Sequence, residues 1–210
     1  MNIGIIGSGN VGGALRARWA AGGHQVVFAS RKPESAEMKA LVATAGPNAR
    51  AGTAEEAVAA SDVVLLATPW PATQAVVAGL GPLDGKILID ATNPILPRLA
   101  GLEFANTTSG AEQIAGWAPG ARVVKAFNTV GFNVMENPDF GGRAATLFYS
   151  GEDKEAKQVV RQLATELGFS AEDAGPLTRA RVLEPFAMMW ITLAMVEGYG
   201  REIGFSLLRR

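Results

Sequence analysis

Short apolar runs alternate along the chain with longer, Ala-rich stretches of helical character. The apolar runs are rich in Val, Ile and Leu, and some contain no polar residue, as in Val63-Val64-Leu65-Leu66-Ala67. Continuous apolar runs of this length are typical of parallel strands that helices cover on both faces. The alternation therefore predicts an α/β fold, with a doubly wound, mostly parallel sheet and a small helical C-terminal portion.

Turn-forming residues such as Gly22-Gly23 and Gly81-Pro82 set the limits of these elements. Strands are expected at Ile3–Ile6, Gln25–Ala29, Val63–Ala67, Lys86–Asp90, Val123–Phe127, Ala145–Tyr149 and Phe169–Ala174. Helices are expected at Asn10–Ala21, Ser35–Ala45, Ala54–Ala60, Pro71–Leu80, Gly110–Trp117, Asp153–Leu167 and Leu177–Ile203. No clear linker is visible, but the composition changes near residue 150. This change predicts a main domain over residues 1–150 and a C-terminal portion over residues 151–210.

The charge balance limits the partners of the chain. Among 210 residues there are 19 Lys and Arg against 20 Asp and Glu, a net charge of −1, and the basic residues form no cluster. This balance predicts no binding of nucleic acid or of an anionic membrane surface. The longest apolar run, Phe186 to Val196, is too short for the roughly 20 residues that span a bilayer. With no targeting segment before the first strand, we expect no membrane insertion and a cytoplasmic location.

Side chains that commonly perform catalysis are scarce. The chain has no Cys and a single His, which excludes disulfides, thiolate nucleophiles and any Cys-ligated or His-rich metal site, and we expect no bound metal. The one His, His24, follows Gly22-Gly23 and begins the second expected strand. It therefore lies at the amino end of the sheet, whereas open α/β sheets bind ligands at the carboxyl ends of their strands. We expect a structural role for His24.

A glycine-rich segment follows the first expected strand. Gly7-Ser8-Gly9-Asn10-Val11-Gly12 matches G-x-G-x-x-G, and an amphipathic helix is expected directly after it. In this strand–loop–helix context Gly7 permits a tight turn, Gly9 leaves room for a pyrophosphate, and Gly12 allows close packing of helix on strand. The free N–H groups at the helix N-terminus attract phosphate. The segment predicts a dinucleotide-binding site of the Rossmann type.

The end of the second expected strand indicates which dinucleotide binds. NAD-preferring sites place a carboxylate there, to bond the adenosine ribose. This chain has Ser30, Arg31 and Lys32 instead. A guanidinium fork, an ammonium and a hydroxyl suit the 2′-phosphate of NADP(H). We therefore predict NADP(H) as the cofactor.

Loops after the later strands complete the predicted pocket. Thr68-Pro69-Trp70 and Ala91-Thr92-Asn93 follow neighbouring strands, and we expect both segments to lie along the dinucleotide. Asn128 and Thr129 end a further strand and are the candidates for substrate binding. The amide of Asn128 is suited to a ring carbonyl or to a carboxamide. Thr-Pro and Asn-Pro are also common turn formers, so each loop alone is weak evidence.

The usual acid–base pairs of carbonyl reductases are missing from the sequence. Tyr149 and Tyr199 are followed four positions later by Asp153 and Ile203 rather than Lys, and no Lys is followed at that spacing by Asn. A carbonyl reductase needs a proton donor for the developing alkoxide. We therefore assign no catalytic residue and expect a redox partner that takes hydride without a protein acid, such as a flavin or deazaflavin. The protein would mainly align two rings.

Several segments jointly resemble one superfamily. They are Ile5-Ile6 with the glycine-rich segment, Ala29-Ser30-Arg31-Lys32, Thr68-Pro69-Trp70, Val124-Lys125-Ala126-Phe127-Asn128-Thr129, and Asp173-Ala174-Gly175-Pro176-Leu177 with Ala180-Arg181 and Glu184. On these the chain resembles the NADP-dependent deazaflavin reductases, which use coenzyme F-420 (F420), and the related cytoplasmic domains of membrane ferric reductases. The resemblance implies a Rossmann domain, a C-terminal portion closing the cleft, a homodimer and hydride transfer between stacked rings.

Two positions place the chain between these branches. Archaeal deazaflavin reductases can carry His where Asn128 stands, and the ferric-reductase branch has a Ser-Asn-Ala-Glu-like segment where this chain has Ser109-Gly110-Ala111-Glu112. The two positions therefore do not identify the hydride acceptor. Two other functions also remain: an NADPH-dependent reductase of a small imine or other organic substrate, and a non-catalytic NADP(H)-binding sensor.

Overall fold

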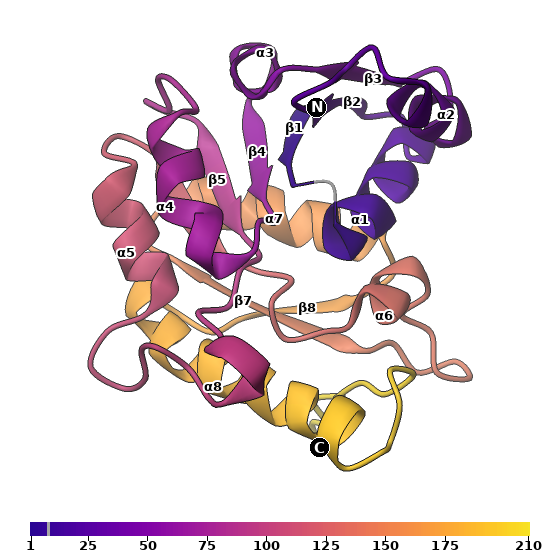
Figure 1. Ribbon diagram of the computed structural model, residues 1–210. Helices are drawn as coiled ribbons and strands as arrows, with labels where there is room; N and C mark the ends of the chain where they lie inside the picture. Colours follow the sequence, from indigo (N-terminus) through magenta and orange to yellow (C-terminus); the bar gives the residue numbers. More distant parts are fainter. Residues whose placement is uncertain (8) are drawn as a thin grey trace.

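One eight-stranded sheet runs through the computed structural model, which describes residues 1–7 and 9–210 (Figure 1). The strand order is β3-β2-β1-β4-β5-β6-β7-β8. β7 is antiparallel to β6, and all other neighbours are parallel. The bounds are β1 Asn2–Ile6, β2 Gln25–Ala29, β3 Ala49–Gly52, β4 Val63–Leu66, β5 Ile87–Asp90, β6 Arg122–Lys125, β7 Thr146–Gly151 and β8 Ser170–Asp173. The Rossmann-type α/β fold expected from the sequence is confirmed.

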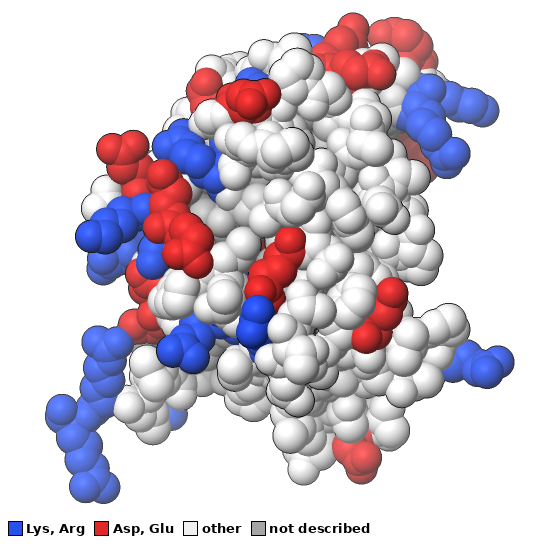
Figure 2. Space-filling model, turned by 90° about the vertical axis from the view of Figure 1, so that its left-hand side faces the viewer, with Lys and Arg blue, Asp and Glu red and all other residues white. Residues whose placement is uncertain are grey.

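Helices cover both faces of the sheet. One face packs against α1 (Asn10–Ala21), α2 (Ala36–Ala45), α6 (Phe132–Glu136) and α7 (Lys154–Glu166). The other packs against α3 (Ala54–Ala59), α4 (Trp70–Ala78), α5 (Gly110–Trp117) and the start of α8 (Ala180–Ile191). Acidic and basic side chains are interspersed on the face that Figure 2 shows. Among residues 1–7 and 9–210, every helix is too short or too polar to cross a membrane.

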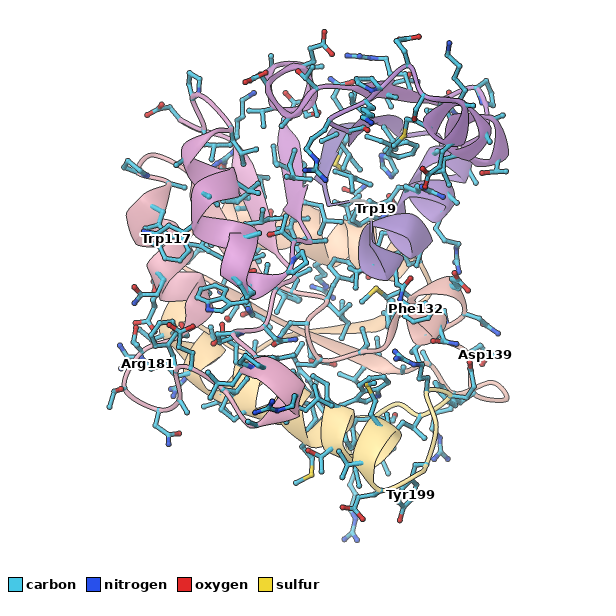
Figure 3. All side chains as sticks on the ribbon, viewed as in Figure 1. Trp19, Trp117, Phe132, Asp139, Arg181 and Tyr199 are labelled. Carbon is cyan, nitrogen blue, oxygen red and sulfur yellow. The ribbon has the colours of Figure 1, made fainter. Side chains whose placement is uncertain are left out.

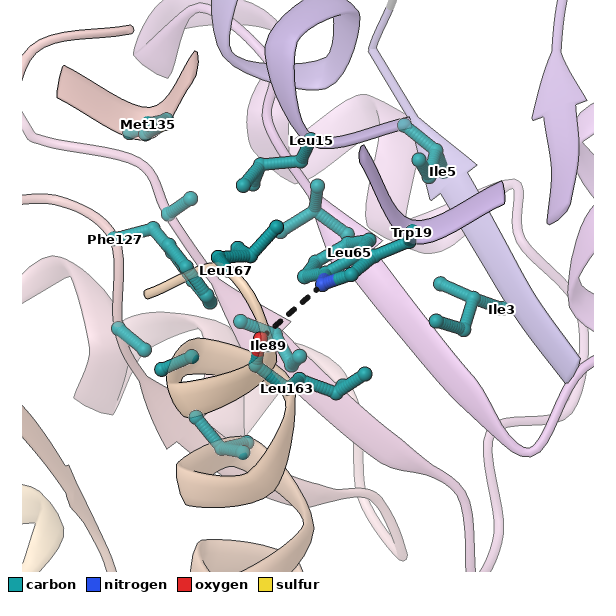
Figure 4. Packing of buried hydrophobic residues seen from close by; sticks show 14 of the residues in the cluster. Ile3, Ile5, Leu15, Trp19, Leu65, Ile89, Phe127, Met135, Leu163 and Leu167 are labelled. Carbon is teal, nitrogen blue, oxygen red and sulfur yellow. Dashed lines mark hydrogen bonds between the residues drawn. The ribbon is translucent and has the colours of Figure 1, made fainter. Parts of the chain in front are cut away.

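Alternate residues of the central strands enter opposite cores. In β4, Leu65 packs into the core beneath α1, and its neighbour Leu66 packs into the core beneath α4. This is why the central strands are continuously apolar in sequence. In the first core the indole of Trp19 lies edge-on to Phe127, with 5.7 Å between ring centroids, and its Nε1 donates to the carbonyl of Leu163 (Figure 4). These contacts join α1 to α7 and to the loop after β6.

The structure differs from the sequence expectation most at the C-terminus. The helix expected over Leu177–Ile203 is wrong in its extent: a 3₁₀ turn at Leu177–Arg179 precedes α8, and a π-helical turn at Thr192–Val196 ends the helical run. Gly198 and Gly200 then have φ values of 79° and 77°, in the left-handed region that stops a right-handed helix. The remaining tail returns to the sheet, where Thr146 N donates to Phe205 O.

Two short elements were not expected from the sequence. β3 reads Ala-Arg-Ala-Gly and has no β-branched residue, and α6 is five residues long. Both depend on tertiary packing rather than on intrinsic propensity. The strand expected over Val123–Phe127 ends at Lys125, because Phe127 has a φ of 64° and turns the chain out of the sheet. The domain boundary expected near residue 150 falls on β7, and the sheet continues past it to β8.

His24 lies at the amino end of the sheet, as its position in the sequence predicts. It is 6% exposed, its Nε2 lies 2.7 Å from Glu166 Oε2 on α7, and its Nδ1 lies 3.2 Å from the N-terminal nitrogen of Met1. These contacts join α7 to the start of the chain. The histidine is therefore a structural residue far from the carboxyl edge.

Candidate functional site

A cavity of about 860 Å³ opens at the carboxyl edge of the parallel strands. Its wall is formed by the loops after β1, β4, β5 and β6, together with the C-terminal helices. The structure brings most of the residues expected at the site onto this wall: Gly7, Gly9, Asn10, Val11, Thr68, Pro69, Trp70, Ala91, Thr92, Asn93 and Asn128. The parallel topology explains the convergence, because the carboxyl ends of all these strands meet at one edge.

Close backbone contacts at two glycines determine the shape of the glycine-rich loop. Gly7 has a φ of 122°, and a Cβ there would lie 2.3 Å from the carbonyl oxygen of Ala67. A Cβ on Gly12 would lie 2.1 Å from Gly7 O, so the close approach of α1 to β1 depends on this glycine. A Cβ on Gly9 would meet nothing within 4 Å, and α1 has no side-chain cap. The loop therefore leaves open space in front of free helix N–H groups. Ser8 lies outside the described residues.

The three residues expected at a 2′-phosphate follow β2. Ser30 N donates to Gly52 O, which fixes the turn, and Ser30 Oγ accepts from Lys32 N at 3.0 Å. Arg31 and Lys32 are exposed, and neither forms an ion pair within the part of the chain that the structure describes. The cavity wall does not include these three residues. They form a separate, positively charged turn at the same edge of the sheet.

A buried ion network beneath the cavity was not foreseen from the sequence. Lys125 is fully buried, and its Nζ lies 2.9 Å from Asp90 Oδ2 and 2.9 Å from Glu184 Oε1. The same carboxylate of Glu184 accepts from the backbone N–H groups of Gly110 and Ala111, at the N-terminus of α5. One cation thus faces two anions, and the helix N-terminus offsets the remaining negative charge. The network joins β5, β6, α5 and α8.

The charge on Lys125 is maintained by its two acidic neighbours. Burial by itself lowers the pKa of Lys125, but the carboxylates of Asp90 and Glu184 outweigh burial and raise the pKa above its usual value. A lysine whose pKa is raised on folding stabilises the folded protein. This stabilisation is lost only as the pH rises through the pKa that the lysine has in the folded state. Lys125 therefore keeps its positive charge throughout the neutral pH range. A sequence signal existed, because a charged residue inside an apolar strand needs a buried partner.

The network also fixes the loop after β5. Lys125 Nζ donates to the carbonyl of Thr92 at 2.6 Å, and Asp90 Oδ1 accepts from both the N–H and the hydroxyl of Thr92. Beside it, Asn93 Nδ2 donates to Asn128 O, and Asn128 Nδ2 donates to Asn93 Oδ1. The loops after β5 and β6 are thus held in one fixed arrangement at the cavity wall.

The side chain of Asn128 can accept a hydrogen bond from a ligand but has no free N–H to donate. Its amide NH₂ donates to Asn93 Oδ1 at 3.1 Å and to the carbonyl of Leu183 at 3.2 Å, so both of its hydrogens are in use. Because a backbone carbonyl only accepts, the orientation of this amide is settled. Asn128 Oδ1 is buried without a partner among the described residues. This favours a ligand N–H, such as a carboxamide, over the ring carbonyl that the sequence left open. Thr129 is 1% exposed and is not part of the cavity wall.

Three further side chains of the wall, those of Thr68, Trp70 and Thr92, are also engaged. Thr73 Oγ1 donates to Pro69 O and lies 2.9 Å from Thr68 Oγ1, and the Thr92 hydroxyl donates to Asp90. The indole of Trp70 donates to Glu103 and stacks on Trp117, which Figure 3 labels. Among the described residues of the wall, Arg201 is the only one with an ionisable side chain. The cavity therefore presents aromatic and amide surfaces with no carboxylic acid, histidine, tyrosine or lysine.

Comparison with known proteins agrees with this geometry. Residues 2–94 match the family model described as NADP oxidoreductase, coenzyme F420-dependent. The F420-dependent NADP reductase of Methanothermobacter thermautotrophicus is 30% identical over 211 residues, which cover 92% of this chain and 89% of that protein. A crystal structure of a putative F420-dependent NADP reductase from Arthrobacter sp. FB24 is 31% identical and has a TM-score of 0.89, with both chains fully covered.

A second branch of relatives is longer than this chain. Metalloreductase STEAP3 of Rattus norvegicus is 32% identical over 186 residues, which are 87% of this chain but 35% of that protein. The chain thus spans about a third of this relative. The family match, the two reductases and the cavity together show that the chain belongs to the family of coenzyme F420-dependent NADP oxidoreductases.

Proposed function

We propose that the protein transfers hydride between NADP(H) and a deazaflavin or flavin ring. The observation that carries this proposal is the absence of a proton donor on the described part of the cavity wall, where Arg201 is the one ionisable side chain. Reduction of a carbonyl needs such a donor, whereas transfer between two redox rings needs mainly alignment. Bound NADPH would supply the hydride.

The residues of the chain have separate parts in this proposal. The loop Gly7 to Gly12 and the free N–H groups of α1 hold the pyrophosphate, while Ser30, Arg31 and Lys32 hold the 2′-phosphate. Thr68, Pro69, Trp70 and the segment Ala91-Thr92-Asn93 line the path of the dinucleotide. Asn128 Oδ1 accepts from an N–H of a bound ring, and the apolar wall around it excludes water. Thr129 is 1% exposed and does not line the cavity, so it has no ligand contact in this proposal.

The proposed 2′-phosphate site predicts a cofactor preference. We expect NADPH to bind at least tenfold more tightly than NADH, because each charge-assisted hydrogen bond contributes roughly 1.5–3 kcal/mol. Arg31→Ala should remove most of this preference while leaving the NADH dissociation constant unchanged. Titration calorimetry of both cofactors against both proteins measures the effect. Equal constants for NADPH and NADH in the unmodified protein would refute the assignment.

We further propose that residues 151–210 close the cleft and form a homodimer contact. Val182 and Met189 are 60% and 55% exposed, and their spacing of seven residues puts them on one side of α8. Val196, in the π-helical turn, and Tyr199 after it are also exposed, and Figure 3 shows Tyr199 at the end of the molecule. Exposed apolar side chains gathered on this part of the chain favour self-association.

Light scattering tests this contact. The expected mass is twice the 21.9 kDa of the chain, and Met189→Glu combined with Val196→Glu should return it to the single-chain value. A single-chain mass for the unmodified protein at all concentrations would contradict the homodimer.

We place the reaction in the cytoplasm because it draws on cellular NADPH.

A panel of acceptors separates the proposal from its alternatives. NADPH oxidation is measured with coenzyme F420, FMN, FAD, ferric chelates and cyclic imines. Turnover on a deazaflavin or flavin is expected. Turnover on an imine alone would favour the small-substrate reductase, and tight NADPH binding with no turnover on any acceptor would favour the NADP(H)-binding sensor.

A further inference from the structure

A single arginine stands at the C-terminal side of the cavity, and neither the phosphate loop nor the 2′-phosphate turn contains it. Arg201 follows the π-helical turn and belongs to the cavity wall with Phe132, Trp190 and Ile191. Figure 3 shows Phe132 on α6, between α1 and the C-terminal helices. The pyrophosphate is expected at the N-terminus of α1, whereas Arg201 belongs to the C-terminal segment that follows the π-helical turn. Arg201 is therefore available to a second ligand.

Arg201 is exposed, and neighbouring residues restrict its position. The guanidinium lies over the ring of Phe132, 5.4 Å from the centroid, and this contact orients its planar fork. The adjacent backbone is fixed as well: Trp190 Nε1 donates to Ile203 O at 2.8 Å, and Asn133 Nδ2 donates to Glu202 Oε1 at 2.7 Å. A Cβ on Gly131 would lie 2.5 Å from the Trp190 ring and 3.6 Å from Arg201 O, so this segment packs directly on the start of α6.

The charge of Arg201 has no acidic partner in the part of the chain that the structure describes. The ion pairs of residues 1–7 and 9–210 do not include Arg201, and its one polar contact is the weak one from Nη2 to Met195 Sδ at 3.7 Å. Glu202, next in the chain, is engaged by Asn133. An oriented and uncompensated guanidinium on the wall of a ligand cavity is suited to a phosphate.

We propose that Arg201 binds a phosphate on the side chain of the hydride-accepting ring and selects acceptors that carry one. The inference rests on the proposed function and names the substrate class of the same site. It predicts that a flavin or deazaflavin with a phosphate-bearing side chain is preferred over the same ring without it. Arg201 acts here on acceptor affinity, and it leaves the binding of NADPH unchanged.

Two ligand pairs test the proposal directly. FMN and riboflavin differ only in the phosphate, and coenzyme F420 is compared with its phosphate-free deazaflavin core. Dissociation constants are measured by fluorescence quenching with NADP⁺ bound, for the unmodified protein, Arg201→Gln, Arg201→Lys and the control Arg161→Gln, an exposed arginine on α7 outside the cavity wall. We expect Arg201→Gln to weaken the phosphate-bearing ligands about tenfold and to leave the phosphate-free ones unchanged. Arg201→Lys should lose part of the affinity for the phosphate-bearing ligands, and Arg161→Gln should lose none of it.

The outcomes separate this inference from the proposed function. Arg201-dependent binding of FMN or F420 without hydride transfer would leave the phosphate site standing and refute the function. Equal binding within both pairs, or equal losses for NADPH and all acceptors in Arg201→Gln, would overturn the phosphate site while turnover continued. Failure of FMN and F420 to bind at all would overturn it too.

Discussion

Lys125→Met should lower the free energy of unfolding by about 3–5 kcal/mol, the usual effect of removing one partner of a buried ion network. The methionine fills a similar volume, so the loss comes from charge rather than from a cavity. It leaves the carboxylates of Asp90 and Glu184 in a fully buried space without their cation. Urea denaturation at pH 7 measures the change.

A second lysine supplies the matched control. Lys157 lies 2.8 Å from Asp173, but that carboxylate is 44% exposed, so Lys157→Met should cost no more than about 1 kcal/mol. If Lys125→Met proves too unstable to purify, Lys125→Met with Asp90→Asn and Glu184→Gln should fold better than the single variant. Equal losses in the free energy of unfolding for Lys125→Met and Lys157→Met would show that the buried ion network does not stabilise the elements that form the site.

Gly12→Ala should raise the NADPH dissociation constant by about 10- to 100-fold. The added Cβ would lie 2.1 Å from Gly7 O, so either α1 or the phosphate loop must move. Forced shifts in a packed region typically cost about 1–3 kcal/mol, and here the shift falls on the groups proposed to hold the pyrophosphate. Calorimetric titration with NADPH reports the loss.

The neighbouring glycine gives the control for this substitution. A Cβ on Gly13 would meet nothing within 4 Å, and the residue lies inside α1. Gly13→Ala should leave NADPH binding unchanged and stabilise the protein by roughly 0.5–1 kcal/mol through helix propensity. A similar loss of NADPH affinity in both variants would point to α1 in general rather than to the close approach at Gly12.

The sequence predicted the elements whose pattern is local. Apolar strands β1, β2, β4 and β5, the glycine-rich loop and the loops at Thr68 and Asn93 follow from runs and motifs within a few residues, and parallel topology then brings these loops together. β3 and α6 were not predicted because their short sequences have little intrinsic propensity for strand or helix. The last helix was overextended because apolar periodicity continues toward Gly198, where two left-handed glycines end it.

The chemistry of the site depends on contacts that no local pattern contains. Glu184 lies 59 positions from Lys125 in sequence and meets it only when α8 packs on the sheet. The orientation of the Asn128 amide likewise depends on Leu183 O, 55 positions away. Arg201 falls inside a helix expected from the sequence. It lies on the cavity wall because the chain turns back after Gly200. The loops that line the cavity could thus be predicted from local motifs, and the residues that position them could not.

Transfer of deuterium from NADPH tests the proposed hydride transfer. NADPH that carries deuterium at both hydrogen positions of the nicotinamide C4 is mixed anaerobically with the protein and with coenzyme F420 or FMN, and the products are analysed by mass spectrometry. We expect rapid turnover with F420 and one deuterium in the reduced deazaflavin for each NADPH oxidised, since the proposed mechanism places the two rings against each other without a protein acid between them. NADPH oxidation that leaves no deuterium in the deazaflavin, or no oxidation with either ring while NADPH binds tightly, would contradict it.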